Sequence, residues 1–365
     1  MRTSPNNKAT EKIGKNRSES SDFLKPEPAQ LLLADGTRFA GNSPLWQPDS
    51  SSGEVVFNTG MTGYVESLTD PSYANQILVF TFPLIGNYGV NLAWSESDKV
   101  QVGGVVVSEA VEHWSHTQSD RSLLAWLRSQ DIPILIGADT RAITKHLRTH
   151  GTMAGTFGRL PEKPPRIVQK FVSIDEPIDY HPKRQKTVIV VDCGSKANIL
   201  RKLEALQVHV RRVPYDYDYS SEKFDGVLLS NGPGDPAAYT QTIAIARRAL
   251  AANKPVFGIC LGSQIIALAA GAKTYKLKFG HRGHNQPCLE VATGRCFITS
   301  QNHGYAIDKK TLPKGWQVSF ENLNDQSVEG IAHATKPFFA VQFHPEACPG
   351  PTDTAWLFEK FRELL

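Results

Sequence analysis

The sequence of 365 residues lacks the long hydrophobic runs of an integral membrane protein. Its longest apolar stretches, such as 77–82 and 265–270, are far shorter than the roughly 20 residues that a helix needs to cross a bilayer. The N-terminus also lacks the apolar segment of a secretory signal. We therefore expect no membrane association, and the length predicts two or three domains.

The sequence also lacks a large excess of charge of either sign. It contains 40 Lys and Arg and 36 Asp and Glu, for a net charge of +4. The first 25 residues hold six basic and three acidic side chains, so the rest is nearly neutral. A nucleic-acid-binding domain would carry a basic stripe, and we expect no nucleic-acid partner. Residues 1–27, rich in Ser, Asn and Lys, are predicted to be a disordered tail, and its acidic residues argue against a transit peptide.

The cysteines are few, odd in number and without a CxxC pair, so the sequence does not predict a disulfide framework. They are Cys193, Cys260, Cys288, Cys296 and Cys348. Unpaired cysteines fit a reducing compartment, and we predict a cytoplasmic location.

Residues 28–150 are predicted to form a β-rich domain with flanking helices. Two apolar segments flank Asp35-Gly36, a pattern typical of a β-hairpin. Further strands are expected at 54–58, 77–82 and 100–108, with helices at 122–129 and 139–147. Prolines interrupt residues 151–185, which we interpret as a linker that contains one strand at 152–157.

Residues 186–365 show alternating strands and helices. Apolar runs at 187–191, 208–213, 226–230 and 255–258 alternate with helical spacing at 197–206, 242–252 and 261–270. This rhythm indicates a doubly wound, mostly parallel sheet covered on both faces. The predicted fold class is therefore α/β, with the β-rich domain first and the doubly wound domain second.

The strongest chemical signal is Gly258-Ile259-Cys260-Leu261-Gly262, between a predicted buried strand and a predicted helix. Flanking glycines permit the sharp turn of a nucleophile elbow, which presents the central side chain at the edge of the sheet. The helix N-terminus stabilises a thiolate. Cys260 is therefore the candidate nucleophile, and the alternative is a buried structural cysteine.

A nucleophile needs a base and a group that orients the base. His344-Pro345-Glu346 follows the apolar strand 339–343, and strand ends of an open α/β sheet meet in one crevice. We predict His344 as the base and Glu346 as its orienting carboxylate. His303 is the rival base, although it has no carboxylate nearby in the sequence.

The loop 230–236, with Gly232 and Gly234, also follows a strand. Its backbone N–H groups could join that of Leu261 in an oxyanion hole.

Three of these segments resemble the signatures of the class I glutamine amidotransferases, and the wider sequence resembles the small subunits of carbamoyl phosphate synthetase. The amidotransferase signatures are 258–264, 231–236 and 344–346. The segments similar to the small subunits are 57–64, 68–73, 85–89, 139–141, 278–281 and 301–305.

The resemblance implies that Cys260 attacks the side-chain amide of glutamine and forms a γ-glutamyl thioester, with His344 moving protons and Glu346 orienting the ring. It implies a site for glutamine and the oxyanion built from Ser72, Gly232, Gly234, Leu261, Gln264, Asn302, Gly304 and Tyr305. It further implies a large partner subunit in a heterodimer or higher oligomer. That subunit would receive ammonia through a tunnel and use bicarbonate and ATP with Mg²⁺ for arginine and pyrimidine biosynthesis, so no cofactor or metal is expected in this chain.

Three alternatives remain open. A stand-alone γ-glutamyl hydrolase would not need residues 28–150, and a non-enzymatic relic would not need an intact Cys260. A zinc site at His281, His284, Cys288 and Cys296 fits no common zinc template, and Gly280 and Gly283 predict a flexible loop there.

Overall fold

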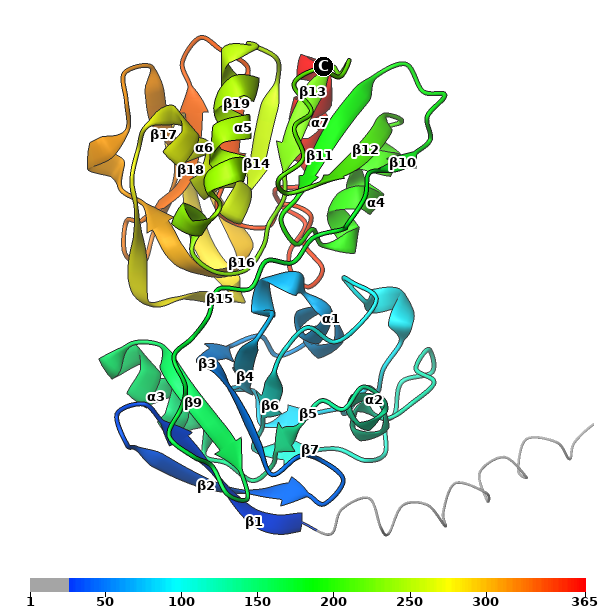
Figure 1. Cartoon of the computed structure of the whole chain (residues 1–365), viewed down its shortest axis with the longest axis vertical. Coiled ribbons are helices and arrows are strands. Elements are labelled where there is room, and N and C mark those ends of the chain that lie inside the picture. Colours follow the sequence, from blue (N-terminus) through cyan, green and yellow to red (C-terminus); the bar gives the residue numbers. More distant parts are fainter. Residues whose placement is uncertain (1–25) are drawn as a thin grey trace, which may run out of the picture.

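A computed structural model describes residues 26–365 as two lobes, each built on its own sheet (Figure 1). The predicted disordered tail 1–27 lies almost wholly outside the described residues. Its last two residues belong to the first strand, which begins at Pro26.

The first lobe holds a seven-stranded sheet in the order β2-β1-β9-β3-β4-β6-β8 and a two-stranded sheet β5-β7. The strands are β1 (Pro26–Leu33), β2 (Arg38–Pro44), β3 (Ser50–Asn58), β4 (Gln76–Phe80), β5 (Leu84–Ile85), β6 (Gly104–Val106), β7 (Glu109–Ala110), β8 (Ile134–Leu135) and β9 (Met153–Gly158). The helices are α1 (Tyr64–Thr69), α2 (Leu123–Ser129), α3 (Thr140–His150) and the 3-10 turns η2 (Pro71–Tyr73) and η3 (Leu92–Trp94).

The predicted elements of this lobe form for local reasons. β1 and β2 pair antiparallel around Gly36, whose φ of 89° suits the tight turn. Ser122 and Asp139 cap α2 and α3 by accepting hydrogen bonds from the N–H groups of Ala125 and Ala142. Apolar clusters with α1 and α2 on one face of the sheet, and with α3 on the other, bury its strands.

The second lobe holds a ten-stranded sheet in the order β10-β12-β11-β13-β14-β19-β18-β17-β15-β16. Its strands are β10 (Ile178–Tyr180), β11 (Thr187–Asp192), β12 (His209–Pro214), β13 (Gly226–Leu229), β14 (Val256–Ile259), β15 (Thr274–Glu290), β16 (Cys296–Ile307), β17 (Trp316–Asn322), β18 (Val328–His333) and β19 (Phe338–Val341). Its helices are α4 (Ala197–Ala205), α5 (Thr240–Ala251), α6 (Leu261–Ala270), α7 (Trp356–Leu364) and the 3-10 turns η4 (Pro236–Ala238) and η5 (Lys309–Thr311).

The fold class predicted from the sequence is confirmed. The neighbours β12, β11, β13, β14 and β19 run parallel, with α5 and α6 in the cluster on one face and α4 and α7 in the cluster on the other. The sheet is mixed, because β10 on one edge and β18, β17, β15 and β16 on the other pair antiparallel.

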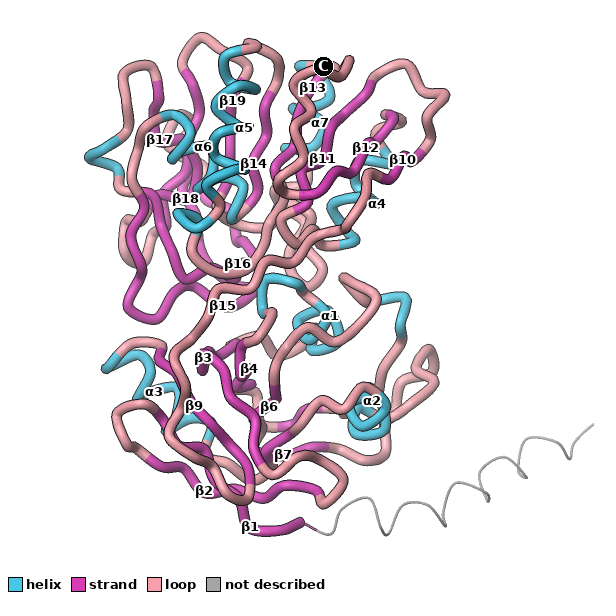
Figure 2. The backbone as a smooth tube through the Cα atoms, in the orientation of Figure 1, coloured by secondary structure: helices cyan, strands magenta, loops and turns pink. Residues whose placement is uncertain are grey.

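The structure differs from the prediction in two places. The strand expected at 152–157 is confirmed as β9, which pairs with β1 and β3, but the predicted linker 151–185 also contains β10, which pairs with β12. The irregular connection between the lobes is therefore 159–177 (Figure 2), and the domain boundaries themselves stay predictions. The flexible loop predicted around Gly280 and Gly283 is wrong, since both glycines lie in β15, which pairs with β16 across two register shifts.

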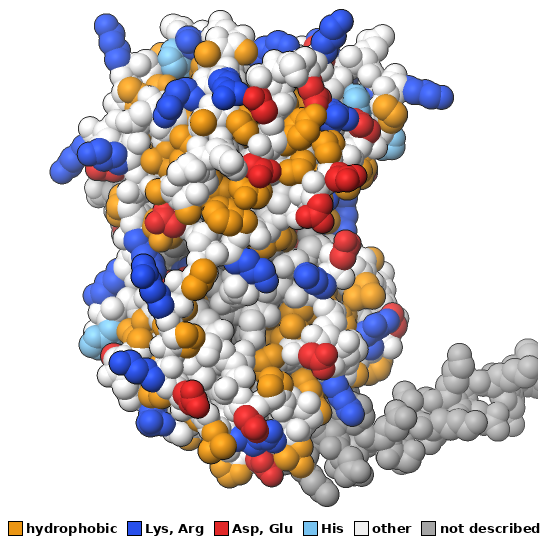
Figure 3. Space-filling view, viewed as in Figure 1, with side chains coloured by type: hydrophobic (Ala, Val, Ile, Leu, Met, Phe, Trp, Pro, Cys, Tyr) orange, Lys and Arg blue, Asp and Glu red, His pale blue; other side chains and the backbone are white. Residues whose placement is uncertain are grey.

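On the face shown in Figure 3, basic and acidic side chains are interspersed over both lobes. Among the described residues, no helix combines the length and apolar character required to cross a membrane.

Candidate active site

Cys260 lies between the end of β14 and the first residue of α6 in a strained backbone conformation. Its φ is 53° and its ψ is −106°, values that a non-glycine residue rarely adopts. The turn is tight enough that a Cβ at Gly262 would lie 2.1 Å from the carbonyl oxygen of Leu229. This geometry is that of the predicted nucleophile elbow.

The ends of β14 and β19 bring the candidate triad residues together. The backbone N–H of Cys260 donates to the carbonyl of Val341 at 2.8 Å, three residues before His344. His344 Nδ1 donates to Glu346 Oε1 at 2.6 Å. All three triad side chains are buried, and His344 Nε2 has no hydrogen-bond partner within the described part of the chain.

The charges around this triad hold the histidine protonated. Burial opposes the charge on His344, but Glu346 and Cys260 raise the pKa of the ring to about 10. Burial likewise opposes the charge on Glu346, yet Lys196 and His344 lower the pKa of that carboxyl to about 2. At neutral pH the site therefore contains an imidazolium ring.

Lys196 is a member of this site that sequence reasoning missed. Its buried Nζ lies 3.1 Å from Glu346 Oε1 and donates to the carbonyl of Ala347 at 2.6 Å. Burial opposes the charge on Lys196, but Glu346 and Glu96 raise the pKa of the amine above its usual value. The one signal in the sequence was a lysine shortly after a buried strand, and nothing linked it to a carboxylate so distant in the chain.

A cavity next to Cys260 brings all of the predicted glutamine-site residues together. Besides Cys260, its lining includes Ser72, Gly232, Gly234, Leu261, Gln264, Asn302, Gly304 and Tyr305. The Cys260 thiol donates to the carbonyl of Asn302 at 3.7 Å. The roles assigned to these residues stay predictions, and the arrangement leaves space for a small polar substrate in contact with the sulfur.

The first lobe contributes two of the groups that order this cavity. Asn231 Nδ2 donates to Ser72 Oγ at 2.8 Å, and Asn302 Nδ2 donates to Asp70 Oδ2 at 3.1 Å. Asp70 also accepts from the backbone N–H of Ser72 at 2.9 Å and so fixes the turn that carries the serine. Sequence reasoning missed Asp70 and Asn231, although both lie within motifs that it had used.

Part of the cavity lining is charged. Lys276 Nζ lies 2.8 Å from Glu54 Oε1, and the buried Arg282 also lines the cavity. Burial lowers the pKa of Arg282, against the attraction of Glu54. These groups can interact with the charged α-amino and α-carboxylate groups of an amino acid.

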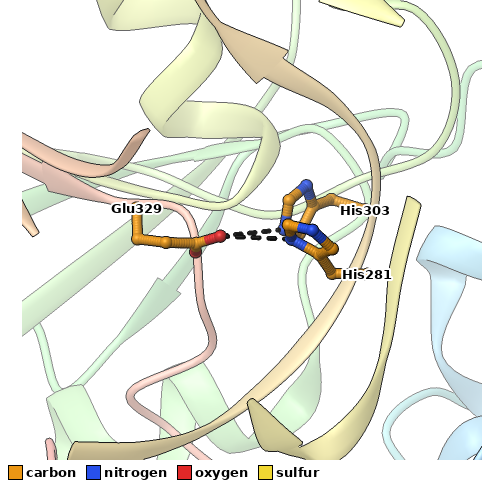
Figure 4. Close-up of side chains that lie close together, drawn as sticks. All are labelled: His281, His303 and Glu329. Carbon is orange, nitrogen blue, oxygen red and sulfur yellow. Dashed lines mark hydrogen bonds and ion pairs between the residues drawn. The ribbon is translucent and has the colours of Figure 1, made fainter. Parts of the chain in front are cut away.

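His303, the rival base, also lines the cavity beside Cys260, but its ring nitrogens belong to another buried network (Figure 4). Its Nδ1 donates to the carbonyl of Tyr305 at 2.8 Å, and its Nε2 lies 3.6 Å from Glu329 Oε1. Both ring nitrogens therefore face this network. His281 Nδ1 contacts the same carboxylate oxygen at 3.2 Å, and His281 Nε2 contacts Asp325 at 2.9 Å.

The network also bears on the zinc alternative. Within residues 26–365, the one group of three close metal-type ligands is His281, His303 and Glu329, which shares only His281 with the predicted set. Burial opposes the charge on His281, but Asp325 and Glu329 raise the pKa of its ring to about 9. We interpret the group as a hydrogen-bond network, because His281 contacts both Asp325 and Glu329 and the ring of His303 faces Glu329.

Two family models match the chain. Residues 31–157 match the family described as carbamoyl-phosphate synthase small chain, CPSase domain, and residues 189–364 match glutamine amidotransferase class-I.

Among curated relatives, the carbamoyl phosphate synthase small chain of Symbiobacterium thermophilum is 47% identical over 354 residues, covering 91% of this chain and 97% of that protein. The small chain of Archaeoglobus fulgidus is 46% identical, covering 92% of this chain and 98% of that protein. The multifunctional protein CAD of Squalus acanthias is 49% identical over 356 residues, or 92% of this chain. This chain spans only 16% of the length of that multifunctional relative.

Proposed function

The chain belongs to the family of carbamoyl phosphate synthase small chains, and from this premise we propose that it hydrolyses glutamine to supply ammonia for carbamoyl phosphate synthesis. The observation that carries the proposal is the strained Cys260, next to the buried His344–Glu346 pair and facing a cavity lined by the predicted glutamine site.

The chemistry follows from the charges of the site. The sulfur of Cys260 attacks the side-chain amide carbon of glutamine, and the resulting oxyanion accepts hydrogen bonds from backbone N–H groups such as that of Leu261. The protonated His344 gives its proton to the amide nitrogen, the C–N bond breaks and ammonia leaves. Water then attacks the γ-glutamyl thioester while His344 takes a proton, which releases glutamate and restores Cys260.

The partner belongs to the same proposal. A large subunit would receive the ammonia through a tunnel and combine it with bicarbonate, using ATP and Mg²⁺ that bind to that subunit. The assembly would be a heterodimer or a higher oligomer that serves pyrimidine and arginine biosynthesis. The five free cysteines support a cytoplasmic location.

The alternatives are less well supported by the geometry. A stand-alone γ-glutamyl hydrolase would have no need for a first lobe, yet Ser72 and Asp70 of that lobe help to build the cavity. A non-enzymatic relic would not maintain a buried, charged triad.

Glutamine hydrolysis by the purified chain, alone and with the large subunit, tests the proposal. We expect weak activity alone and a strong stimulation by the partner with ATP and bicarbonate, because docking would bring the catalytic groups to productive spacing. Cys260→Ser should abolish hydrolysis, since a serine hydroxyl has no thiolate character at neutral pH.

As the control, the Cys260→Ser assembly should still make carbamoyl phosphate from added ammonia. Full activity of the isolated chain, indifferent to any partner, would favour the hydrolase alternative. Hydrolysis retained in Cys260→Ser would remove Cys260 as the nucleophile.

A further inference from the structure

Helix α4 begins at the catalytic site without a side-chain cap of its own. Its N-cap residue is Lys196, and no side-chain hydrogen bond from that residue satisfies the first turn. The first N–H groups of any helix lack partners within the helix and need acceptors from elsewhere. At a buried helix end such acceptors must come from neighbouring protein groups.

Glu96 of the first lobe supplies these acceptors. Its backbone carbonyl accepts from the N–H of Ala197 at 2.9 Å, and its Oε2 accepts from the N–H of Asn198 at 3.0 Å. Its Oε1 lies 3.4 Å from Arg201 Nη1, one turn along α4. The Glu96 side chain is fully buried, so one residue of the first lobe caps a helix of the second.

The same helix end contacts the catalytic carboxylate. Lys196 forms the buried ion pair with Glu346 described above, and Asn198 Nδ2 donates to the backbone carbonyl of Glu346. The backbone N–H of Lys196 also donates to Asn231 Oδ1 at 3.0 Å, beside the cavity. A shift of the first turn of α4 would therefore move two contacts of Glu346 at once.

We propose that Glu96 is a positioning residue that caps α4 across the lobe junction and thereby holds Glu346, and through it His344, in the catalytic arrangement. The inference rests on the proposed function and extends it, because it makes the triad of the second lobe depend on the position of the first lobe. Glu96 is not among the residues that line the cavity, and it acts through the first turn of α4, next to Lys196 and Asn198.

Electrostatics supports this assignment. Burial raises the pKa of Glu96 to about 7, although Lys196 and the N–H of Asn198 favour the charged form, while Glu346 disfavours it. Arg201 faces the carboxylate from the solvent side. Burying a carboxyl group costs free energy unless it is hydrogen-bonded or paired with a charge. The hydrogen bond from the N–H of Asn198 and the charge of Lys196 offset this cost for Glu96.

The test compares variants in the full chain assembled with the large subunit. Glu96→Ala removes the carboxylate, and we expect kcat for glutamine hydrolysis to fall by about 10- to 100-fold with KM within about twofold, since small displacements of catalytic groups cost this much. Glu96→Gln keeps an acceptor for the N–H of Asn198 and should retain kcat within about threefold. A loss confined to KM, or an equal loss in both variants, would overturn the proposal.

Arg201→Gln is the matched control, because it removes the ion pair of Glu96 and leaves the cap in place. We expect its kcat to stay within about twofold of the parent value. If Glu96→Ala does not fold, Glu96→Asp withdraws the carboxylate by one methylene group and should show the same loss in kcat. Unchanged kcat in a folded Glu96→Asp variant would also overturn the proposal.

A second readout separates this inference from the proposed function. The rate at which iodoacetamide alkylates Cys260, followed on its peptide by mass spectrometry across pH, reports the charge state of the triad without any substrate. We expect Glu96→Ala, but not Arg201→Gln, to change this pH profile. If the parent chain does not hydrolyse glutamine, the proposed function is wrong, but the alkylation profile still tests the role of Glu96. Identical profiles in the parent chain and in Glu96→Ala would refute that role.

Discussion

At the scale of single residues, the site combines backbone strain with buried charge. Cys260 has a φ of 53° in a turn that needs glycine at position 262, where a Cβ would meet the carbonyl oxygen of Leu229, and Lys196 offsets the charge of Glu346. The turn places buried Cys260 at the cavity, and the charges hold a proton on His344. Each group therefore has a distinct task, and substitutions should separate the tasks.

Replacing the proton carrier should cost more than replacing the group that orients it. We predict that His344→Ala slows thioester formation by about 10²–10⁴-fold, the usual contribution of a positioned acid–base group. Glu346→Ala should cost clearly less, because the ring that carries the proton stays in place, although the variant also removes the ion pair with Lys196. Single-turnover rates provide the measurement, with His303→Ala as the comparison.

Equal losses in His344→Ala and Glu346→Ala would mean that the base is misassigned. So would a larger loss in His303→Ala, whose ring faces Glu329 in the structure.

At the scale of elements, the sequence predicted what regular patterns encode. The strand 187–191 was predicted because a parallel strand covered on both faces has a continuous apolar sequence. The helix 261–270 was predicted because its apolar residues recur at helical spacing. β15 was missed because its two glycines and its register shifts break the alternation expected of a strand. His344 was found because it follows a strand end, whereas Lys196 and Asp70 meet the site only through packing that no local pattern shows.

The side-chain contacts of His281 on β15 with Asp325 and Glu329 should make stability depend on pH. The pKa of His281 is raised from 6.5 to about 9 by Asp325 and Glu329 against the effect of burial. Because the folded state binds the proton more tightly, this contribution is full below pH 6.5 and is lost as the pH rises to about 9. We predict a loss of about 1–3 kcal/mol in the free energy of unfolding over this window.

Urea unfolding at pH 6, 7.5 and 9 would measure this loss. His281→Gln should make the profile less steep, since glutamine cannot gain the proton, while the contribution of His344 remains. A variant that keeps the same slope as the parent chain would show that other groups cause it.

At the scale of the whole molecule, the two lobes contact each other at the candidate active site. Ser72 and Asp70 reach the cavity from the first lobe, and Glu96 caps the helix behind the triad. The β-rich domain was predicted only as the surface on which the partner docks, and that role stays a prediction. Its contacts with Asn231 and Asn302 add a second role, because they make the first lobe part of the cavity beside Cys260.

The central claim is that Cys260 carries the glutamyl group during turnover. The direct measurement is rapid acid quenching of the assembled enzyme during glutamine hydrolysis, followed by proteolysis and mass spectrometry of all five cysteine peptides. We predict one base-labile glutamyl adduct on the Cys260 peptide, formed within the first turnover and absent from Cys260→Ser. Sustained glutamine hydrolysis with the adduct on another cysteine would contradict the account. So would a His344→Ala variant that still hydrolyses glutamine and forms no adduct at all.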